Sequence, residues 1–70
     1  MEHIEFSLTT DYIELIKLLK LLNLAESGAD AKSAVEQGLV ICNNEKEYRK
    51  RKKLRSGDVV IFQNNQILII

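Results

Sequence analysis

The apolar and polar positions of this 70-residue chain follow first a strand-like and then a helix-like spacing. Residues 3–8, HIEFSL, alternate between polar and apolar side chains, which predicts a short, half-buried strand at the edge of a sheet. In the following stretch, TTDYIELIKLLKLLNL, Glu14, Lys17 and Lys20 recur every third position among apolar residues. That spacing predicts a helix of about three turns that is buried on most of its sides.

Both ends of this first helix carry residues typical of caps. Asp11 is followed three positions later by Glu14, which predicts that a capping box opens the helix. Asn23 is expected to end it, with Leu24 packing back against it.

A second helix is expected to begin at Ser27, because the serine hydroxyl can accept a hydrogen bond from the free amides of the first turn. Gly38 is suited to end this helix, since glycine readily adopts the left-handed backbone of a helix C-terminus. Its inward face is made of small side chains, which predict close packing on the first helix: Ala31, Ala34 and Val35.

The second half of the chain is strand-like. Residues 39–42 and 45–48 flank Asn43 and Asn44, and asparagine tolerates the left-handed backbone of a two-residue hairpin. Two more strands are predicted, VVIF after the turn cluster at 56–58 and QILII at the C-terminus. The predicted class is therefore α+β, with two packed helices against a small, mainly antiparallel sheet that contains a β-hairpin.

Composition adds limits to this fold. With 46% apolar residues, 29% charged residues and no proline, residues 1–70 are expected to form one small domain. Cys42 is the only cysteine, so it cannot form an intramolecular disulfide, and a reducing cytoplasm is the simplest location. Its apolar neighbours favour a buried, unreactive thiol over a redox-sensing thiol, and the nearby basic run keeps the second role open. Since the chain shows no signal peptide and no membrane-spanning run, no membrane association is expected.

Catalytic chemistry has few candidate residues. The single histidine, His3, is expected to face solvent, and no Cys and His pair has the spacing of metal ligands. Neither a glycine-rich phosphate loop nor a nucleophile motif is present. The sequence therefore predicts a protein that is not an enzyme and that has no cofactor, metal or small-molecule substrate.

The charge sums to zero but is divided between the two halves of the chain. Residues 1–30 hold six acids and two bases, whereas residues 31–70 hold eight bases and four acids. Six of the bases lie in RKRKKLR, at positions 49–55. The run can be a solvated edge that prevents aggregation, or a localisation signal. A phosphate-binding surface explains best why six cations stand together without an acid.

The conformation of RKRKKLR decides which cations act together. If the run is extended, Arg49, Arg51 and Lys53 are expected on one face and the other cations largely on another. Leu54 is expected to be the buried residue that sets the register. Tyr48, just before the run, could stack on a nucleobase, but a tyrosine at the end of a hairpin strand more often packs on its neighbours.

The order of these segments resembles the S4 RNA-binding domain, a module with the αL motif, over residues 11–62. The resemblance rests on LIKLLKLLNLAES for the leucine-rich helix, AKSAVEQGLVICNN for the second helix and hairpin, and YRKRKKLRSGDVVIF for the basic stretch and last turn. The chain departs from the family at Gly28, where arginine is typical, and at Asn44, where glycine is typical. The segment SGADAK is similar to short, free-standing bacterial members, in which the domain is nearly the whole protein.

The resemblance implies a protein that binds structured RNA, such as ribosomal or transfer RNA, with the ribosome as a candidate partner. Recognition is expected to use phosphates and shape more than stacking, because the chain has few aromatic residues. The amides after Ser27, unobstructed at Gly28, are expected to receive a phosphate. The RNA-binding face that the resemblance implies comprises Ser27, Gly28, Lys32, Gln37, Asn43, Arg49, Lys50, Arg51, Lys52, Lys53 and Arg55.

Two other functions stay open from the sequence. The leucine-rich helix could be partly exposed as a docking surface, in which case the chain is a protein-protein interaction module and the basic run meets an acidic partner. Alternatively, the chain is a regulatory subunit of an enzyme and supplies no catalytic groups of its own.

Overall fold

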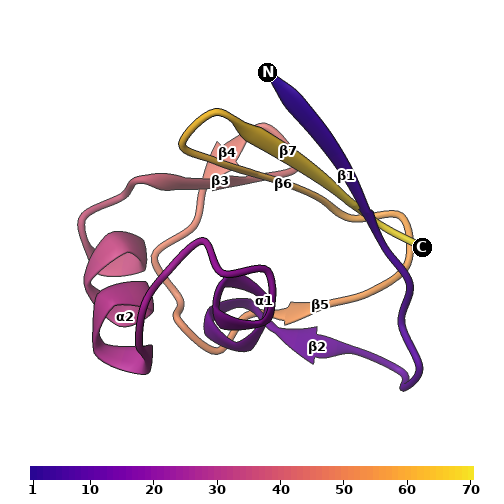
Figure 1. The fold of residues 1–70 in the computed structure, drawn as a ribbon, viewed down its shortest axis with the longest axis horizontal. Coiled ribbons are helices and arrows are strands. Elements are labelled where there is room, and N and C mark those ends of the chain that lie inside the picture. The colour runs from indigo at the N-terminus through magenta and orange to yellow at the C-terminus, as the bar shows by residue number, and fades with distance from the viewer.

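The helices and the main sheet form two layers, with both helices on one face of the sheet and the opposite face uncovered (Figure 1). The computed structural model describes residues 1–70. The two helices are α1 (Leu15–Leu21) and α2 (Gly28–Glu36). The strands of the main sheet, in spatial order, are β1 (Glu2–Phe6), β7 (Asn65–Ile69), β6 (Val59–Phe62), β3 (Val40–Cys42) and β4 (Glu45–Lys46). A separate two-stranded sheet beside α1 consists of β2 (Ile13–Glu14) and β5 (Lys53–Leu54).

The main sheet is mixed but mainly antiparallel, as predicted. β1 runs parallel to β7, while the three other strand pairs are antiparallel. The strand expected at residues 3–8 is β1, and it forms one edge of the sheet. Side chains alternate between the two faces, since Val60 is fully buried toward the helices whereas its neighbour Ile61 is only half-buried. This arrangement confirms the α+β class.

The prediction of a capping box at the start of α1 is wrong. The helix begins at Leu15 and has seven residues, and Glu14 at its N-cap makes no side-chain bond to the first turn. Glu14 is instead part of β2, which pairs with β5 and is therefore extended. The first two amides of the helix donate to carbonyls far away in the sequence: Leu15 to Lys52 and Ile16 to Lys50. A tertiary contact thus replaces the local cap, and α1 is about one turn shorter than predicted.

The other predicted caps are confirmed. The Ser27 hydroxyl accepts a hydrogen bond of 3.2 Å from an amide in the first turn of α2, and Gly38 follows that helix with a φ of 74°. Asn23 ends α1 with a φ of 58°. The amide of Leu24 reaches back to the carbonyl of Leu19 at 2.9 Å, which is the bond of a Schellman motif.

One hydrophobic core fills the space between the helices and the sheet. α1 contributes Leu15, Leu18 and Leu19, which are all fully buried. Ala31 and Val35 of α2 are also fully buried, so the predicted inward face of this helix is confirmed. Neither helix has the length and hydropathy that a membrane-spanning helix requires.

Leu54 is fully buried in β5, which confirms its predicted role as the anchor of the basic run. Replacing Leu54 by alanine should destabilise the fold by about 2 to 5 kcal/mol, because the cavity left in the core removes packing contacts. A domain of this size has only about 3 to 5 kcal/mol of net stability, so this loss should remove a large part of it.

Urea unfolding followed by circular dichroism would measure this loss. Leu21→Ala is the matched control, since Leu21 is 56% exposed on α1 and its truncation should change the free energy of unfolding by no more than about 0.5 kcal/mol. Equal stability of the two variants would show that Leu54 is not an anchor.

Candidate nucleic-acid interface

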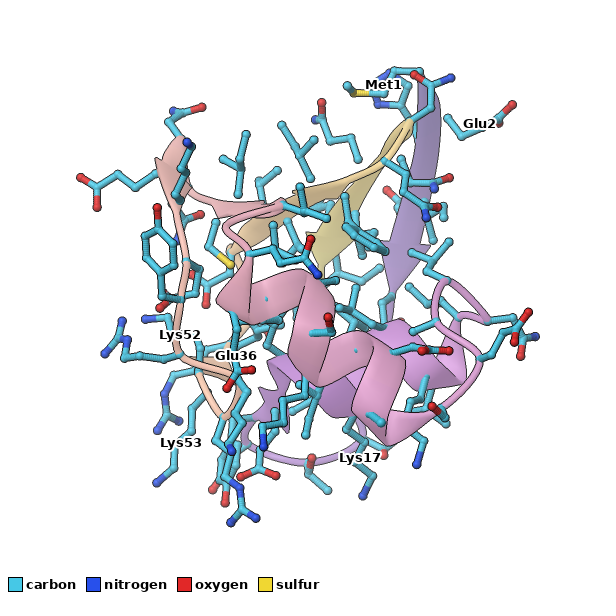
Figure 2. The ribbon with its side chains drawn as sticks, turned by 90° about the vertical axis from the view of Figure 1, so that its left-hand side faces the viewer. Met1, Glu2, Lys17, Glu36, Lys52 and Lys53 are labelled. Carbon is cyan, nitrogen blue, oxygen red and sulfur yellow. The ribbon has the colours of Figure 1, made fainter.

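Residues 49–53, called the basic loop below, leave the hairpin at β4 and pass the start of α1 before they enter β5 (Figure 1). The loop is not extended, because the amide of Lys52 donates to the carbonyl of Arg49 at 3.1 Å and closes a turn. Only Lys53 belongs to a strand. The expected alternation of the cations between two faces is therefore wrong. Figure 2 shows Lys52 and Lys53 on the same side of the molecule.

The main chain of the basic loop is bonded to the first turn of α1. The carbonyl of Lys52 accepts from the Leu15 amide at 2.9 Å, and the carbonyl of Lys50 accepts from the Ile16 amide at 3.2 Å. Leu54 then inserts into the core directly after the loop. The backbone that carries the cations is thereby held at both of these points.

Glu47 and Arg49 form the only ion pair of the structure, at the entrance to the basic loop. The Glu47 carboxylate, 9% exposed as a residue, accepts bonds from Arg49 Nε at 2.9 Å, Nη2 at 3.1 Å and the backbone amide at 3.0 Å. The side-chain bond from Arg49 lowers the pKa of the Glu47 carboxyl and raises the pKa of the Arg49 guanidinium, although burial acts against the ionised acid. The charge of Arg49 is thus largely compensated, whereas no acid pairs with the other cations of the loop.

At the far end of the loop, two cationic side chains lie over the ring of Tyr12. Lys53 Nζ lies 4.9 Å from the ring centroid and the guanidinium carbon of Arg55 lies 5.6 Å from it. Both distances are within the range of cation–π attraction. No sequence pattern points to Tyr12, because its partners Lys53 and Arg55 lie far along the chain.

Asp58 organises the turn that follows Arg55. One carboxylate oxygen accepts from the Arg55 amide at 2.8 Å, and the other accepts from Asn43 Nδ2 at 3.2 Å. The Asn43 side-chain oxygen in turn accepts from the Val59 amide at 2.9 Å. These bonds connect the hairpin to β6 and use both polar atoms of the Asn43 side chain.

The remaining predicted site residues lie on α2. The Gln37 side chain donates to Ser33 Oγ at 2.7 Å, and Lys32 is exposed and has no ion pair. Gly28 lies beside α1, where a side chain at this position would come 3.9 Å from the stem of Lys20. No hydrogen bond or ion pair connects Ser27 or Gly28 with the basic loop.

The structure therefore holds Arg49 to Lys53 and Arg55 in one segment between the hairpin and β6, and no hydrogen bond or ion pair joins the start of α2 to this segment. Figure 2 shows the opposite end of α2, where Glu36 is labelled, on the side of Lys52 and Lys53. The contacts expected from Ser27, Gly28, Lys32, Gln37 and Asn43 stay predictions.

Cys42 is buried, as expected, in the hydrophobic core beneath the hairpin. Burial, together with the nearby carboxylate of Glu47, raises the pKa of its thiol to about 11. Because thiolates rather than thiols are nucleophilic, Cys42 is suited to packing rather than to reaction.

The comparisons with known proteins agree with this fold. Residues 6–70 match the family model of the S4 domain. The protein YbcJ of Escherichia coli (strain K12) is 39% identical over 59 residues, which are 84% of this chain and 84% of that protein. YbcJ of Shigella flexneri matches with the same values. The solution structure of YbcJ from E. coli, described as revealing an αL motif involved in RNA binding, covers 94% of this chain and 85% of its own with a TM-score of 0.71.

The Glu47 and Arg49 pair predicts a stability that depends on pH. Because the folded chain lowers the pKa of Glu47 below its ordinary value of 4.5, the stabilisation is complete above that pH and is lost as the pH falls through the folded-state pKa. Glu47→Gln should therefore flatten the fall of the unfolding free energy below about pH 4.5, measured by urea unfolding at several pH values.

Glu45→Gln is the matched control, since Glu45 is exposed on β4 and has no ion pair. This control should keep the pH dependence of the unmodified chain. If Glu47→Gln keeps it as well, the pair does not set the acid stability of the loop.

Proposed function

Because this chain belongs to the S4 domain family, we propose that it is a non-enzymatic protein that binds structured RNA through the surface around the basic loop. The description of E. coli YbcJ, a relative with the same fold, supports this proposal. Ribosomal or transfer RNA in the cytoplasm is the partner that we propose, with an assembled ribosome as one setting for the contact.

The observation that carries the proposal is a loop whose main chain is fixed and whose cations, apart from Arg49, have no acid partner. A solvated tail would lose conformational freedom whenever its lysines met phosphates. Here the main chain of the loop is already held by the amides of Leu15 and Ile16 and by the burial of Leu54. Binding then requires mainly the ordering of the side chains, so less free energy is lost on association.

The distribution of charge favours selective rather than general attraction to polyanions. The whole chain is neutral, with an excess of acids in residues 1–30. Salt screens charges beyond about 10 Å at 0.1 M, so an RNA phosphate interacts mainly with the cations next to it. A partner must therefore present its phosphates to the basic loop in a suitable shape, as structured RNA does.

The rival role, docking of a protein on the leucine-rich helix, receives less support. Three leucines of α1 are fully buried in the core of the same chain, and Leu21 is the one leucine of this helix that is exposed. A single exposed leucine is common on soluble proteins and does not by itself indicate an interface.

RNA affinity should depend on the cations of the basic loop. The double variant Arg51→Gln and Lys52→Gln should weaken RNA binding and lower the slope of log affinity against log salt by roughly 1.4 to 1.8, at about 0.7 to 0.9 per lost phosphate contact. Fluorescence anisotropy of a labelled RNA, titrated at several salt concentrations, measures both quantities.

The matched control is the double variant Lys17→Gln and Lys46→Gln, which removes the same charge from α1 and β4. Its salt slope should stay close to that of the unmodified chain. Duplex DNA of equal length should bind more weakly than RNA. Equal losses in both double variants would place the attraction in the overall charge rather than in the basic loop, and no binding of any RNA at low salt would refute the proposed function.

A further inference from the structure

Tyr48 is a large aromatic side chain that lies directly before the basic loop and is 58% exposed. Packing on its neighbours, the role expected for it from the sequence, thus covers less than half of the residue. An exposed aromatic ring is unremarkable by itself, because much of any protein surface is apolar. The evidence for a ligand comes from the backbone bonds on both sides of this residue and from the contact of its ring with Gly38.

The backbone on both sides of Tyr48 is fixed by hydrogen bonds. The Glu47 amide donates to the carbonyl of Val40 at 2.9 Å, which continues the pairing of the hairpin. The Arg49 amide donates to the Glu47 carboxylate at 3.0 Å. The Glu47 side chain is buried, whereas Tyr48, the next residue, is largely exposed.

The ring itself rests on Gly38, just after the C-terminus of α2. A Cβ atom at position 38 would lie 3.1 Å from Oη of Tyr48 and 2.9 Å from its Cε1, and the second distance is shorter than real Cβ atoms show. Gly38 also has a φ of 74°, which most other residues adopt only with strain. The absence of a side chain at Gly38 therefore leaves room for the phenol end of Tyr48 beside the C-terminus of α2.

The second exposed tyrosine differs in this respect. Tyr12, at the opposite end of the basic loop, already holds the side chains of Lys53 and Arg55 against its ring. The structure shows no such cation on the ring of Tyr48. Of the two rings beside the loop, Tyr48 is the one that is available to a ligand.

We propose that Tyr48 is a stacking platform for one unpaired nucleobase, whose flanking phosphates are held by the cations of the basic loop. This inference rests on the proposed function and narrows the partner to RNA with at least one nucleotide outside a duplex. Bases stack on aromatic side chains without much regard to their identity, since every base has a π face. Because hydrogen bonds already hold the backbone on both sides of Tyr48, less entropy is lost when a base stacks on its ring.

Affinities for two RNAs with the same number of phosphates test the platform: a hairpin with unpaired loop nucleotides and a fully paired duplex. Tyr48→Leu, which keeps apolar bulk but removes the aromatic ring, should weaken hairpin binding about 5-fold to 100-fold and change duplex binding by less than about 2-fold. Tyr48→Phe is the matched control and should bind both RNAs as the unmodified chain does.

NMR of the full chain provides a readout that does not depend on a variant of Tyr48. The chain has two tyrosines and no tryptophan, so Tyr12→Phe identifies the ring signals of Tyr48 directly. The hairpin should shift these signals upfield, because a stacked base places the ring protons in its ring current, and the duplex should not.

The outcomes separate the two proposals. If the hairpin binds but leaves the Tyr48 ring signals unmoved and Tyr48→Leu binds normally, stacking is refuted while RNA binding stands. If Tyr48→Leu weakens hairpin and duplex equally, the ring only shapes the loop, and stacking is again refuted. If neither RNA binds to the unmodified chain, the proposed function fails and the inference fails with it.

Discussion

The first turn of α1 begins with amides that its own helix cannot satisfy, and the carbonyls of Lys52 and Lys50 accept their hydrogen bonds. This contact joins two segments that are far apart in the sequence. It ends the strand β2, starts the helix and holds the main chain of the basic loop. The first helix and the candidate RNA surface are consequently built by the same bonds, and neither can be displaced without the other.

Cations that stand side by side repel one another, and the fold stabilises them from both ends of the run. Glu47 binds the backbone and side chain of Arg49, and Asp58 binds the backbone amide of Arg55. Hydrogen bonds to ionised carboxylates are stronger than those between neutral groups. Both acids act mainly on the main chain or on a terminal cation, so the charges of Lys50, Arg51 and Lys52 stay unpaired.

A small domain that keeps so many unpaired cations must gain its stability elsewhere. The fully buried leucines of α1, the small side chains of α2 and the inner face of the sheet form the core that supplies it. Leu54 connects this core to the basic loop, since it lies one residue beyond the last lysine. Burial of one apolar side chain thus opposes the repulsion among its charged neighbours.

The two tyrosines at this surface have different roles. Tyr12 holds cations of the same chain, while the ring of Tyr48 lies beside Gly38 and is largely exposed. A chain with only two tyrosines and two phenylalanines therefore places both tyrosines at the ends of its basic loop. The surface therefore combines cations with two aromatic rings.

The sequence by itself determined the features whose causes lie within a few residues. Ser27 caps α2 and Gly38 ends it because hydroxyl geometry and left-handed backbone are local properties. Asn43 and Asn44 form the hairpin turn for the same reason, with φ values of 50° and 72°. Alternating hydrophobicity predicted β1, and Leu54, the one apolar residue of the cationic run, was correctly predicted to be buried. The order of the motifs identified the family.

Only the tertiary structure decided where α1 begins, how the basic loop turns and which cations remain unpaired. Asp11 and Glu14 matched a local capping signal, yet pairing of β2 with β5 kept this segment extended. The burial of Glu47 and the cations on Tyr12 depend likewise on how the chain folds back on itself. Such contacts form between surfaces that exist only after the helices have packed on the sheet, so no pattern of neighbouring residues encodes them.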